Sequence, residues 1–273
     1  MESQQNMIHP SASIAPGAVL GSGVKIGPFC TLGPQVVLGD GVELVSHVVL
    51  DGRTQLGAGV KLYPFCTVGL APQDLKYRGE ETETAIGPRT QIREHASIHR
   101  GTVTGAGITR IGADCLLMAS VHVAHDCVVG DSVIMSNNVV LGGHVEVGER
   151  AIIGGAAALL QFVRVGAGAM VGGLTGVTRD VTPYCRVFGP RAEVLGLNII
   201  GLRRRGLEKA QLHLISAAYK FIFTGPGVFA DRLVAARAQF GADPYVGEML
   251  DFMTNPSRHG IITTLARGGD TEG

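Results

Sequence analysis

Residues 111–177 read IGADCLLMASVHVAHDCVVGDSVIMSNNVVLGGHVEVGERAIIGGAAALLQFVRVGAGAMVGGLTGV, and an aliphatic side chain returns at every sixth position. The same period holds upstream, so it governs most of the chain. At 45% hydrophobic content, twelve consecutive matches have a chance probability of roughly 1 in 10⁴, so the repeat is real. The repeating positions are Ile8, Ile14, Leu20, Ile26, Leu32, Leu38, Leu44, Leu50, Leu56, Leu62 and Val68, then Ile111, Leu117, Val123, Val129, Met135, Leu141, Val147, Ile153, Leu159, Val165, Val171 and Val177.

The residues around each aliphatic position indicate what one repeat forms. Glycine often follows it directly, and the residue four places on is small or β-branched. A short strand with two inward apolar residues, followed by a glycine-assisted corner, builds a coil of parallel β-structure. Forty glycines, no tryptophan and 5% aromatic residues suit many tight corners around a narrow core. The sequence therefore predicts a β-solenoid over residues 1–190.

Two polar interruptions, near residues 69–85 and 99–110, are expected to loop out at corners of the solenoid. The first carries Gln73, Asp74 and Lys76, which would suit a lid over a polar ligand, although a solvated loop without function is the alternative. After residue 190 the spacing of apolar residues becomes helical. We expect a helical C-terminal domain over 191–273, with long helices near 207–221, 228–239 and 244–254 and a tail that frays after Arg267.

Composition limits the classes of protein to consider. No run of 18 uncharged apolar residues predicts a transmembrane helix, and Met1 to Pro10 lacks the features of a signal peptide, so a cytoplasmic location is expected. The net charge is zero, and no nucleic-acid partner is expected. Four of the five cysteines occupy the small inward position of a repeat, and no CxxC pair suggests zinc, so neither disulfides nor a metal is expected.

A three-sided coil stacks positions that are three hexads apart above one another, and this register groups several polar side chains. One column reads His125, Gly143, Gln161; the next reads Asp126, His144, Phe162; a third, of small residues, reads Asn137, Gly155, Gly173. His122 lies just before the first column. A lone exposed histidine is usually incidental, but three histidines with an aspartate and a glutamine in register predict a functional site. The third column is expected to form a smooth groove close by.

These residue types favour one kind of chemistry. A neutral imidazole is a suitable general base at neutral pH, and His125 could fill that role. Gly143 above it could offer an unobstructed backbone N–H to an oxyanion. No serine or cysteine lies in the same register as a covalent nucleophile. The combination predicts direct acyl transfer onto a small acceptor.

Specific motifs then point to a known family. The chain resembles the UDP-N-acetylglucosamine O-acyltransferases that begin lipid A synthesis, over nearly its whole length. The matching motifs are QDLKY (73–77), IHRGT (98–102), AHDC (124–127), GGH (142–144), MVGG (170–173) and GLNIIGLRRRG (196–206). The resemblance implies a left-handed β-helix, against the usual right-handed crossover, followed by a helical domain. It also implies a homotrimer with active sites at the subunit interfaces.

The same resemblance assigns roles to individual residues. His125 would be the general base, Asp126 would hold its imidazole, and Gly143 would supply the oxyanion-hole amide. The residues implied to line the UDP-sugar site are His122, His144, Gln161, Asn198, Arg204 and Arg205. Gln73, Asp74 and Lys76 would contact the acyl end, with Met170 and Gly173 along a hydrocarbon groove. The donor would be a 3-hydroxyacyl phosphopantetheine thioester on acyl carrier protein, an acidic partner for the Arg203–Arg205 cluster, and no cofactor is expected.

Two positions depart from the family pattern. Leu160 stands where well-known members have His, and Ile200 stands where an acidic residue is common. These departures leave open a 3-amino sugar nucleotide as acceptor, which would give an amide.

Three further alternatives fit the sequence less well. The related N-acyltransferase that acts later in the pathway is disfavoured by the QDLKY loop and because the hexads begin at Ile8. A γ-class carbonic anhydrase would hold a metal with three histidines, whereas we expect no stoichiometric zinc. A structural or ice-binding solenoid would need flat threonine arrays, which a local histidine cluster does not resemble.

Overall fold

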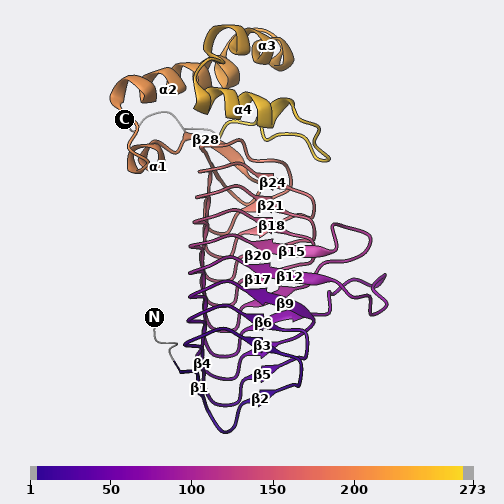
Figure 1. Cartoon of the computed structure of the whole chain (residues 1–273). Helices are drawn as coiled ribbons and strands as arrows, with labels where there is room; N and C mark the ends of the chain where they lie inside the picture. The colour runs from indigo at the N-terminus through magenta and orange to yellow at the C-terminus, as the bar shows by residue number, and fades with distance from the viewer. Residues whose placement is uncertain (1–4, 267–273) are drawn as a thin grey trace.

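The computed structural model describes residues 5–266 and consists of a left-handed parallel β-helix capped by helices (Figure 1). Three sheets form the sides of the coil, and most strands are two residues long. Within the coil, successive strands of a sheet pair in parallel, as Ile134 does with Ile152 and Ile152 with Met170. The stacking of positions three hexads apart is therefore confirmed in the uninterrupted coils.

The strands divide among the three sheets as follows. Sheet A contains β1 (Met7–Ile8), β4 (Lys25–Ile26), β7 (Glu43–Leu44), β10 (Lys61–Leu62), β13 (Gln91–Ile92), β16 (Leu116–Leu117), β19 (Ile134–Met135), β22 (Ile152–Ile153), β25 (Met170–Val171), β27 (Cys185–Phe188) and β28 (Glu193–Leu197). Sheet B contains β2 (Ser13–Ile14), β5 (Thr31–Leu32), β8 (Val49–Leu50), β11 (Thr67–Leu70), β14 (Ser97–His99), β17 (His122–Val123), β20 (Val140–Leu141), β23 (Ala158–Leu159) and β26 (Gly176–Val177). Sheet C contains β3 (Val19–Leu20), β6 (Val37–Leu38), β9 (Arg53–Leu56), β12 (Glu83–Ile86), β15 (Ile108–Ile111), β18 (Val128–Val129), β21 (Glu146–Val147) and β24 (Arg164–Val165).

The core is the stack of inward aliphatic side chains inside the coil. Leu117, Met135 and Ile153 lie above one another and are fully buried. The small residues four places after each aliphatic position, such as Cys127, fill the inside of the corners. At the N-terminal end Ile8 remains 45% exposed, because no coil within the described residues precedes it. The hexad period thus determines both the fold and its core.

Both polar interruptions leave the coil at the corner between sheets B and C. Arg53 pairs with Glu83, which lies farther along the chain than one regular coil would place it. The additional residues form the first loop, residues 71–82. Glu83 pairs in turn with Ile108, again farther along the chain than one regular coil, and the additional residues form the second loop, residues 100–107. The two loops project side by side from one edge of the coil (Figure 1).

The coil ends in a β-hairpin that the hexads did not predict. Strand β28 runs antiparallel to β27, which closes sheet A and turns the chain toward the helices. The helices are α1 (Ile199–Arg204), α2 (Lys209–Thr224), α3 (Phe229–Phe240) and α4 (Pro244–Thr254). Helix α4 begins at Pro244, where the Asp243 side chain accepts hydrogen bonds from the backbone N–H groups of Tyr245 and Val246.

Helix α4 also contacts the last coils directly. Arg164 pairs with Asp180, which is fully buried, and its guanidinium lies over the Phe252 ring. No helix within residues 5–266 is long and apolar enough to cross a membrane. The predicted frayed tail after Arg267 lies outside the described residues.

Candidate active site

His125, Asp126 and His144 meet at the B–C corner, beside the two loops. The Nδ1 atom of His125 lies 2.8 Å from Oδ2 of Asp126, and Nε2 of His144 lies 3.9 Å from the same oxygen. Because an ionised carboxylate only accepts, the His125 proton resides on Nδ1 and leaves Nε2 as the basic nitrogen. Asp126 has φ 59° and His144 has φ 61°, a left-handed corner conformation that Asp and His adopt more readily than most residues.

The Asp126 carboxylate is buried, with 1% of its side chain exposed, and the second loop supplies its hydrogen bonds. It accepts from the backbone N–H groups of Thr102 and Gly107 and from the Thr102 hydroxyl. Burial alone would raise the pKa of Asp126, but the hydrogen bonds from Thr102 and His125 outweigh burial and hold the pKa below its usual value. The carboxylate is therefore ionised and can fix the His125 tautomer.

Gly143 lies directly against the His125 ring. A Cβ atom at this position would lie 2.7 Å from both Cε1 and Nε2 of His125, closer than a real side chain permits. The Gly143 N–H donates to no acceptor among residues 5–266. The sequence prediction that Gly143 stacks over His125 is confirmed, and its free amide lies next to the basic nitrogen.

Two further histidines extend the site along sheet B. The ring of His99, only 6% exposed, meets the His122 ring edge to face at 4.9 Å. Burial, with smaller contributions from His122 and His125, lowers the pKa of His99 to about 4. Burial also lowers the pKa of His122, whose Nδ1 is hydrogen-bonded to the Ser97 hydroxyl at 2.7 Å. Both imidazoles are therefore neutral near pH 7.

The first loop reaches the same site. Burial lowers the pKa of His144, while the carboxylates of Asp126 and, to a smaller extent, Asp74 act in the opposite direction. The Asp74 carboxylate accepts from the backbone N–H of Lys76 at 3.0 Å, and the side chains of Gln73 and Lys76 are exposed. The first loop thus presents Gln73 and Lys76 to solvent, and its contact with a ligand stays a prediction.

The segment after α4 covers the other side of the corner. The His259 Nε2 atom is hydrogen-bonded to the backbone oxygen of Gln161 at 2.9 Å, and the guanidinium of Arg258 lies 3.9 Å from the centre of the Phe162 ring. Phe162 stacks in turn on His144, with ring centres 4.3 Å apart. Sequence reasoning missed Arg258 and His259, because residues so far along the chain from Gln161 carry no periodic signal of contact.

Comparisons with known proteins show the family of the chain. Residues 180–262 match the family described as UDP N-acetylglucosamine O-acyltransferase, domain 2, and residues 17–52 and 108–143 match the bacterial transferase hexapeptide repeat. The chain is 45% identical over 251 residues to an acyl-[acyl-carrier-protein]–UDP-N-acetylglucosamine O-acyltransferase from Anaeromyxobacter sp. (strain Fw109-5), covering 92% of this chain and 98% of that protein. The chain belongs to the UDP-N-acetylglucosamine O-acyltransferase family.

Solved structures of this acyltransferase family share the whole fold. The enzyme from Moraxella catarrhalis is 39% identical with a TM-score of 0.91, and the match covers 93% of this chain and 99% of that one. The UDP-N-acetylglucosamine acyltransferase from Campylobacter jejuni is 34% identical with a TM-score of 0.89, covering 95% and 100%. The left-handed β-helix and helical cap are therefore those of the acyltransferase family.

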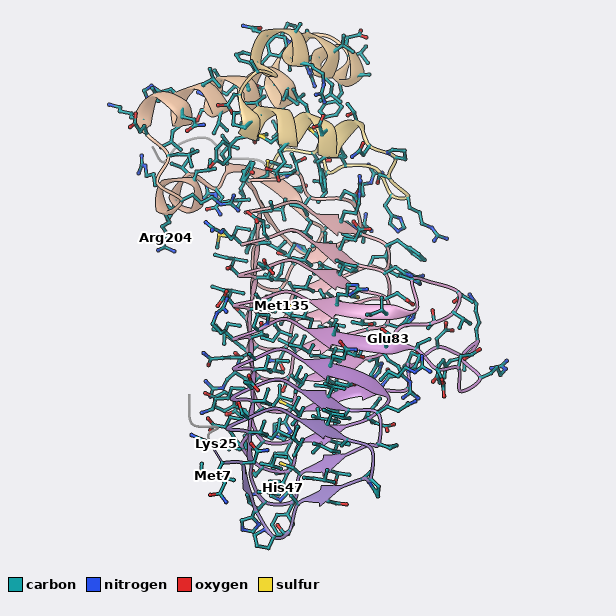
Figure 2. All side chains as sticks on the ribbon, in the orientation of Figure 1. Met7, Lys25, His47, Glu83, Met135 and Arg204 are labelled. Atoms are coloured by element: carbon teal, nitrogen blue, oxygen red, sulfur yellow. The ribbon has the colours of Figure 1, made fainter. Side chains whose placement is uncertain are left out.

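Other site residues predicted from the sequence lie away from the B–C corner of the coil. Asn198 donates to the backbone oxygen of Gly168, and Arg205 pairs with Glu149 at 3.6 Å, which places both at the C–A corner. Arg204 is exposed on α1, on the side of the molecule opposite Glu83, the first residue after the first loop (Figure 2). Within one chain, these residues therefore lie at a different corner from His125.

The small-residue column also lies away from His125, which corrects the expected groove position. A Cβ on Gly173 would lie 3.2 Å from the Gly155 oxygen, and one on Gly155 would lie 3.4 Å from the Asn137 oxygen, so the column does stack. However, it lies at the A–B corner, where Met170 on β25 is 38% exposed. The reason is the hexad period: Asn137 lies two hexads after His125, and each hexad moves the chain one corner around the coil.

A metal at His125, Asp126 and His144 fits the structure poorly. Their ligand atoms all lie within 4.8 Å of one another. However, Oδ2 of Asp126 already accepts from the Thr102 hydroxyl and from His125 Nδ1, which leaves it little capacity for a metal. The third histidine that a carbonic-anhydrase-like site requires is not part of this group.

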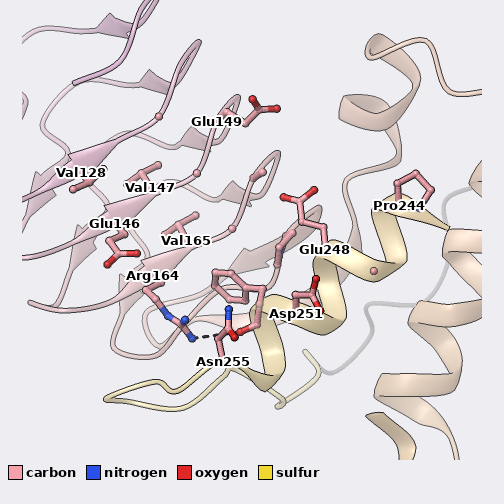
Figure 3. Close-up of a pocket in the computed structure, with 17 residues that line it drawn as sticks. Val128, Glu146, Val147, Glu149, Arg164, Val165, Pro244, Glu248, Asp251 and Asn255 are labelled. Carbon is pink, nitrogen blue, oxygen red and sulfur yellow. Dashed lines mark hydrogen bonds between the residues drawn. The ribbon is translucent and has the colours of Figure 1, made fainter. Parts of the chain in front are cut away.

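A cavity of about 790 Å³ lies elsewhere, between sheet C and helix α4 (Figure 3). Its walls include Glu146, Glu149, Arg164, Glu248 and Asp251. None of the site residues predicted from the sequence lines it. This cavity is therefore not formed by the residues that meet at the B–C corner.

Proposed function

We propose that the protein transfers a 3-hydroxyacyl chain from acyl carrier protein to the 3-hydroxyl of the glucosamine unit of UDP-N-acetylglucosamine, the first step of lipid A synthesis. One observation carries the proposal: the Asp126-held imidazole of His125 lies beside the free N–H of Gly143. A base and an oxyanion donor side by side are what acyl transfer requires. The names of the similar proteins support the choice of donor and acceptor.

The proposed reaction follows from these atoms. Nε2 of His125 takes the proton of the acceptor hydroxyl as its oxygen attacks the thioester carbonyl carbon. The developing oxyanion accepts a hydrogen bond from the Gly143 N–H, and Asp126 stabilises the imidazolium. The C–S bond then breaks, and the imidazolium returns its proton to the thiolate that leaves. No covalent enzyme intermediate is needed.

We further propose that the active enzyme is a homotrimer in which two chains build each site. The support is that Asn198, Arg204 and Arg205 lie at a different corner from His125 in one chain, so one chain alone cannot apply both groups to one nucleotide sugar. The hydrocarbon groove would likewise come from the A–B corner of a neighbour, with Met170 and Gly173. The exposed Arg203 and Arg204 on α1 would attract the acidic acyl carrier protein.

The cytoplasm is the proposed location. All five cysteines are free and buried, which accords with a reducing compartment.

A 3-amino UDP-sugar is the second candidate acceptor. Leu160 is 43% exposed beside Gln161, and Ile200 is 60% exposed on α1, where the family pattern has groups that ionise or hydrogen-bond. An amine acceptor would be converted by the same base into an amide.

Mass spectrometry of the product tests these proposals. The purified enzyme is incubated with 3-hydroxyacyl carrier proteins and either UDP-N-acetylglucosamine or its 3-amino analogue. Our proposal expects one added acyl group on UDP-N-acetylglucosamine, in an ester that hydroxylamine cleaves. A hydroxylamine-resistant product formed only from the amino sugar would favour the second candidate. Absence of product from both would overturn the proposed function.

A further inference from the structure

The second loop, like the first, interrupts a solenoid whose uninterrupted corners turn within a few residues. It lengthens one coil, since Ser97 pairs with His122 instead of with a residue three hexads on. Its first residues are tied to the neighbouring coil by hydrogen bonds from Arg100 N–H to the Leu70 oxygen and from Gly101 N–H to the Glu83 oxygen, and at its last residue the Gly107 oxygen accepts the Glu83 N–H. The loop is therefore held in one position over the B–C corner.

The inner side of the loop hydrogen-bonds the Asp126 side chain. The Thr102 N–H lies 3.1 Å from both carboxylate oxygens, and the Thr102 hydroxyl donates to Oδ2 at 2.6 Å. The Gly107 N–H donates to Oδ1 at 3.2 Å. From below, the Thr109 hydroxyl accepts the backbone N–H of Asp126 at 2.9 Å. The loop thus holds the Asp126 carboxylate, and Thr109 holds its backbone.

Gly105 completes this enclosure by having no side chain. A Cβ there would lie 2.5 and 2.6 Å from the two carboxylate oxygens of Asp126. The φ of Gly105 lies outside the left-handed region, so backbone strain does not require glycine at this position. Glycine is required because there is no space for a Cβ against the Asp126 carboxylate.

We propose that the second loop is an orienting device for the Asp126 carboxylate, in which Thr102 and Gly105 are positioning residues for the acyl-transfer reaction. With Oδ1 held by Gly107 and Oδ2 by the Thr102 hydroxyl, the carboxylate cannot rotate, and Oδ2 stays directed at His125 Nδ1. Neither residue touches the substrate; both act through Asp126. The inference rests on the proposed role of His125 as the base.

The central test is Thr102→Val, which keeps the size and the backbone N–H of Thr102 but removes the hydroxyl. We expect kcat to fall about 10-fold, the effect of one net hydrogen bond, with the KM values of donor and acceptor little changed. Since the hydroxyl lowers the pKa of Asp126, its loss raises that pKa and moves the acid limb of the kcat profile to higher pH. Thr102→Ser restores the hydroxyl and should restore kcat.

Two controls separate positioning from stability. Thr90 is equally buried, and its hydroxyl donates to the Gly112 oxygen at 2.8 Å far from the site, so Thr90→Val should lower the melting temperature without lowering kcat. In an Asp126→Ala background, Thr102→Val should cause no additional loss of kcat, because its target is gone. An equal loss in both backgrounds would overturn the proposal.

A readout without substrate separates this inference from the proposed function. Nitrogen-15 NMR of the imidazoles should show His125 protonated at Nδ1 in the wild type and a mixture of tautomers in Thr102→Val and Gly105→Ala. This result stands even if the acyl acceptor is different. An unchanged tautomer in both variants would refute the orienting role, whatever reaction the enzyme performs.

Discussion

The substitution Gly143→Ala tests the geometry of the site with one methyl group. Its Cβ would lie 2.7 Å from Cε1 and Nε2 of His125 and 3.3 Å from Nδ1. Ordinary non-bonded contacts are about 3.5–4.0 Å, so the imidazole must move by roughly 1 Å. The φ of Gly143 lies outside the left-handed region, so the backbone itself accepts alanine. The strain therefore falls on the orientation of His125.

The magnitude follows from that displacement. A shift of about 1 Å breaks the 2.8 Å contact between His125 and Asp126 and misaligns the base. Misplacement by this amount costs about 10²-fold in rate, or about 2.7 kcal/mol of transition-state stabilisation. The ring is the far end of a side chain with 15% exposure, so the fold loses only the net value of one hydrogen bond, about 1 kcal/mol.

The assay compares kcat and the melting temperature of the wild type, Gly143→Ala and Gly247→Ala. Gly247 lies in α4, away from the site, and its Cβ would meet the Gly241 oxygen at 3.4 Å, an ordinary contact. We expect Gly247→Ala to retain full kcat. Gly143→Ala should remain folded while its kcat falls about 10²-fold. A folded Gly143→Ala enzyme with nearly normal kcat would refute the close approach of Gly143 and His125 on which the mechanism depends.

Three further predictions concern the base, the groove and pH. His125→Ala should leave assembly and melting unchanged while kcat/KM falls on the order of 10² or more; near-normal turnover would show that another group is the base. Gly173→Met, whose Cβ alone would lie 3.2 Å from the Gly155 oxygen, should shift preference toward shorter acyl donors by roughly 1–3 kcal/mol, and an unchanged chain-length profile would place the groove elsewhere. The pKa of His99 is about 4 in the folded protein against 6.5 in the unfolded chain, so between these values the unfolded chain binds the proton more tightly. The free energy of unfolding should therefore fall by about 3 kcal/mol as pH drops through that window. A His99→Leu variant that keeps the same pH slope would contradict this.

Periodicity explains why the fold and half of the site could be predicted from the sequence. A strict hexad period turns position in the chain into position in space, so His125 and Gly143, three hexads apart, had to be stacked. The pairing of His125 with Asp126 also follows, since the two are adjacent at one corner. The Gly155–Gly173 column was predicted close to His125 but lies one corner away, because the number of hexads that separates it from His125 was not taken into account.

The loops lie outside this periodicity, and only the tertiary structure decides what they contact. The threonine that holds Asp126 precedes it by 24 residues and not by the three hexads of one regular coil, because the loop itself shifts the register. Likewise, Arg258 and His259 reach the corner only because helix α4 folds back onto the last coils. The sequence by itself determined the coil, its core and the stacked residues, since each follows from repeated local spacing. The enclosure of the carboxylate and the separation of Arg205 from His125 depend on contacts between distant segments, for which no local pattern exists.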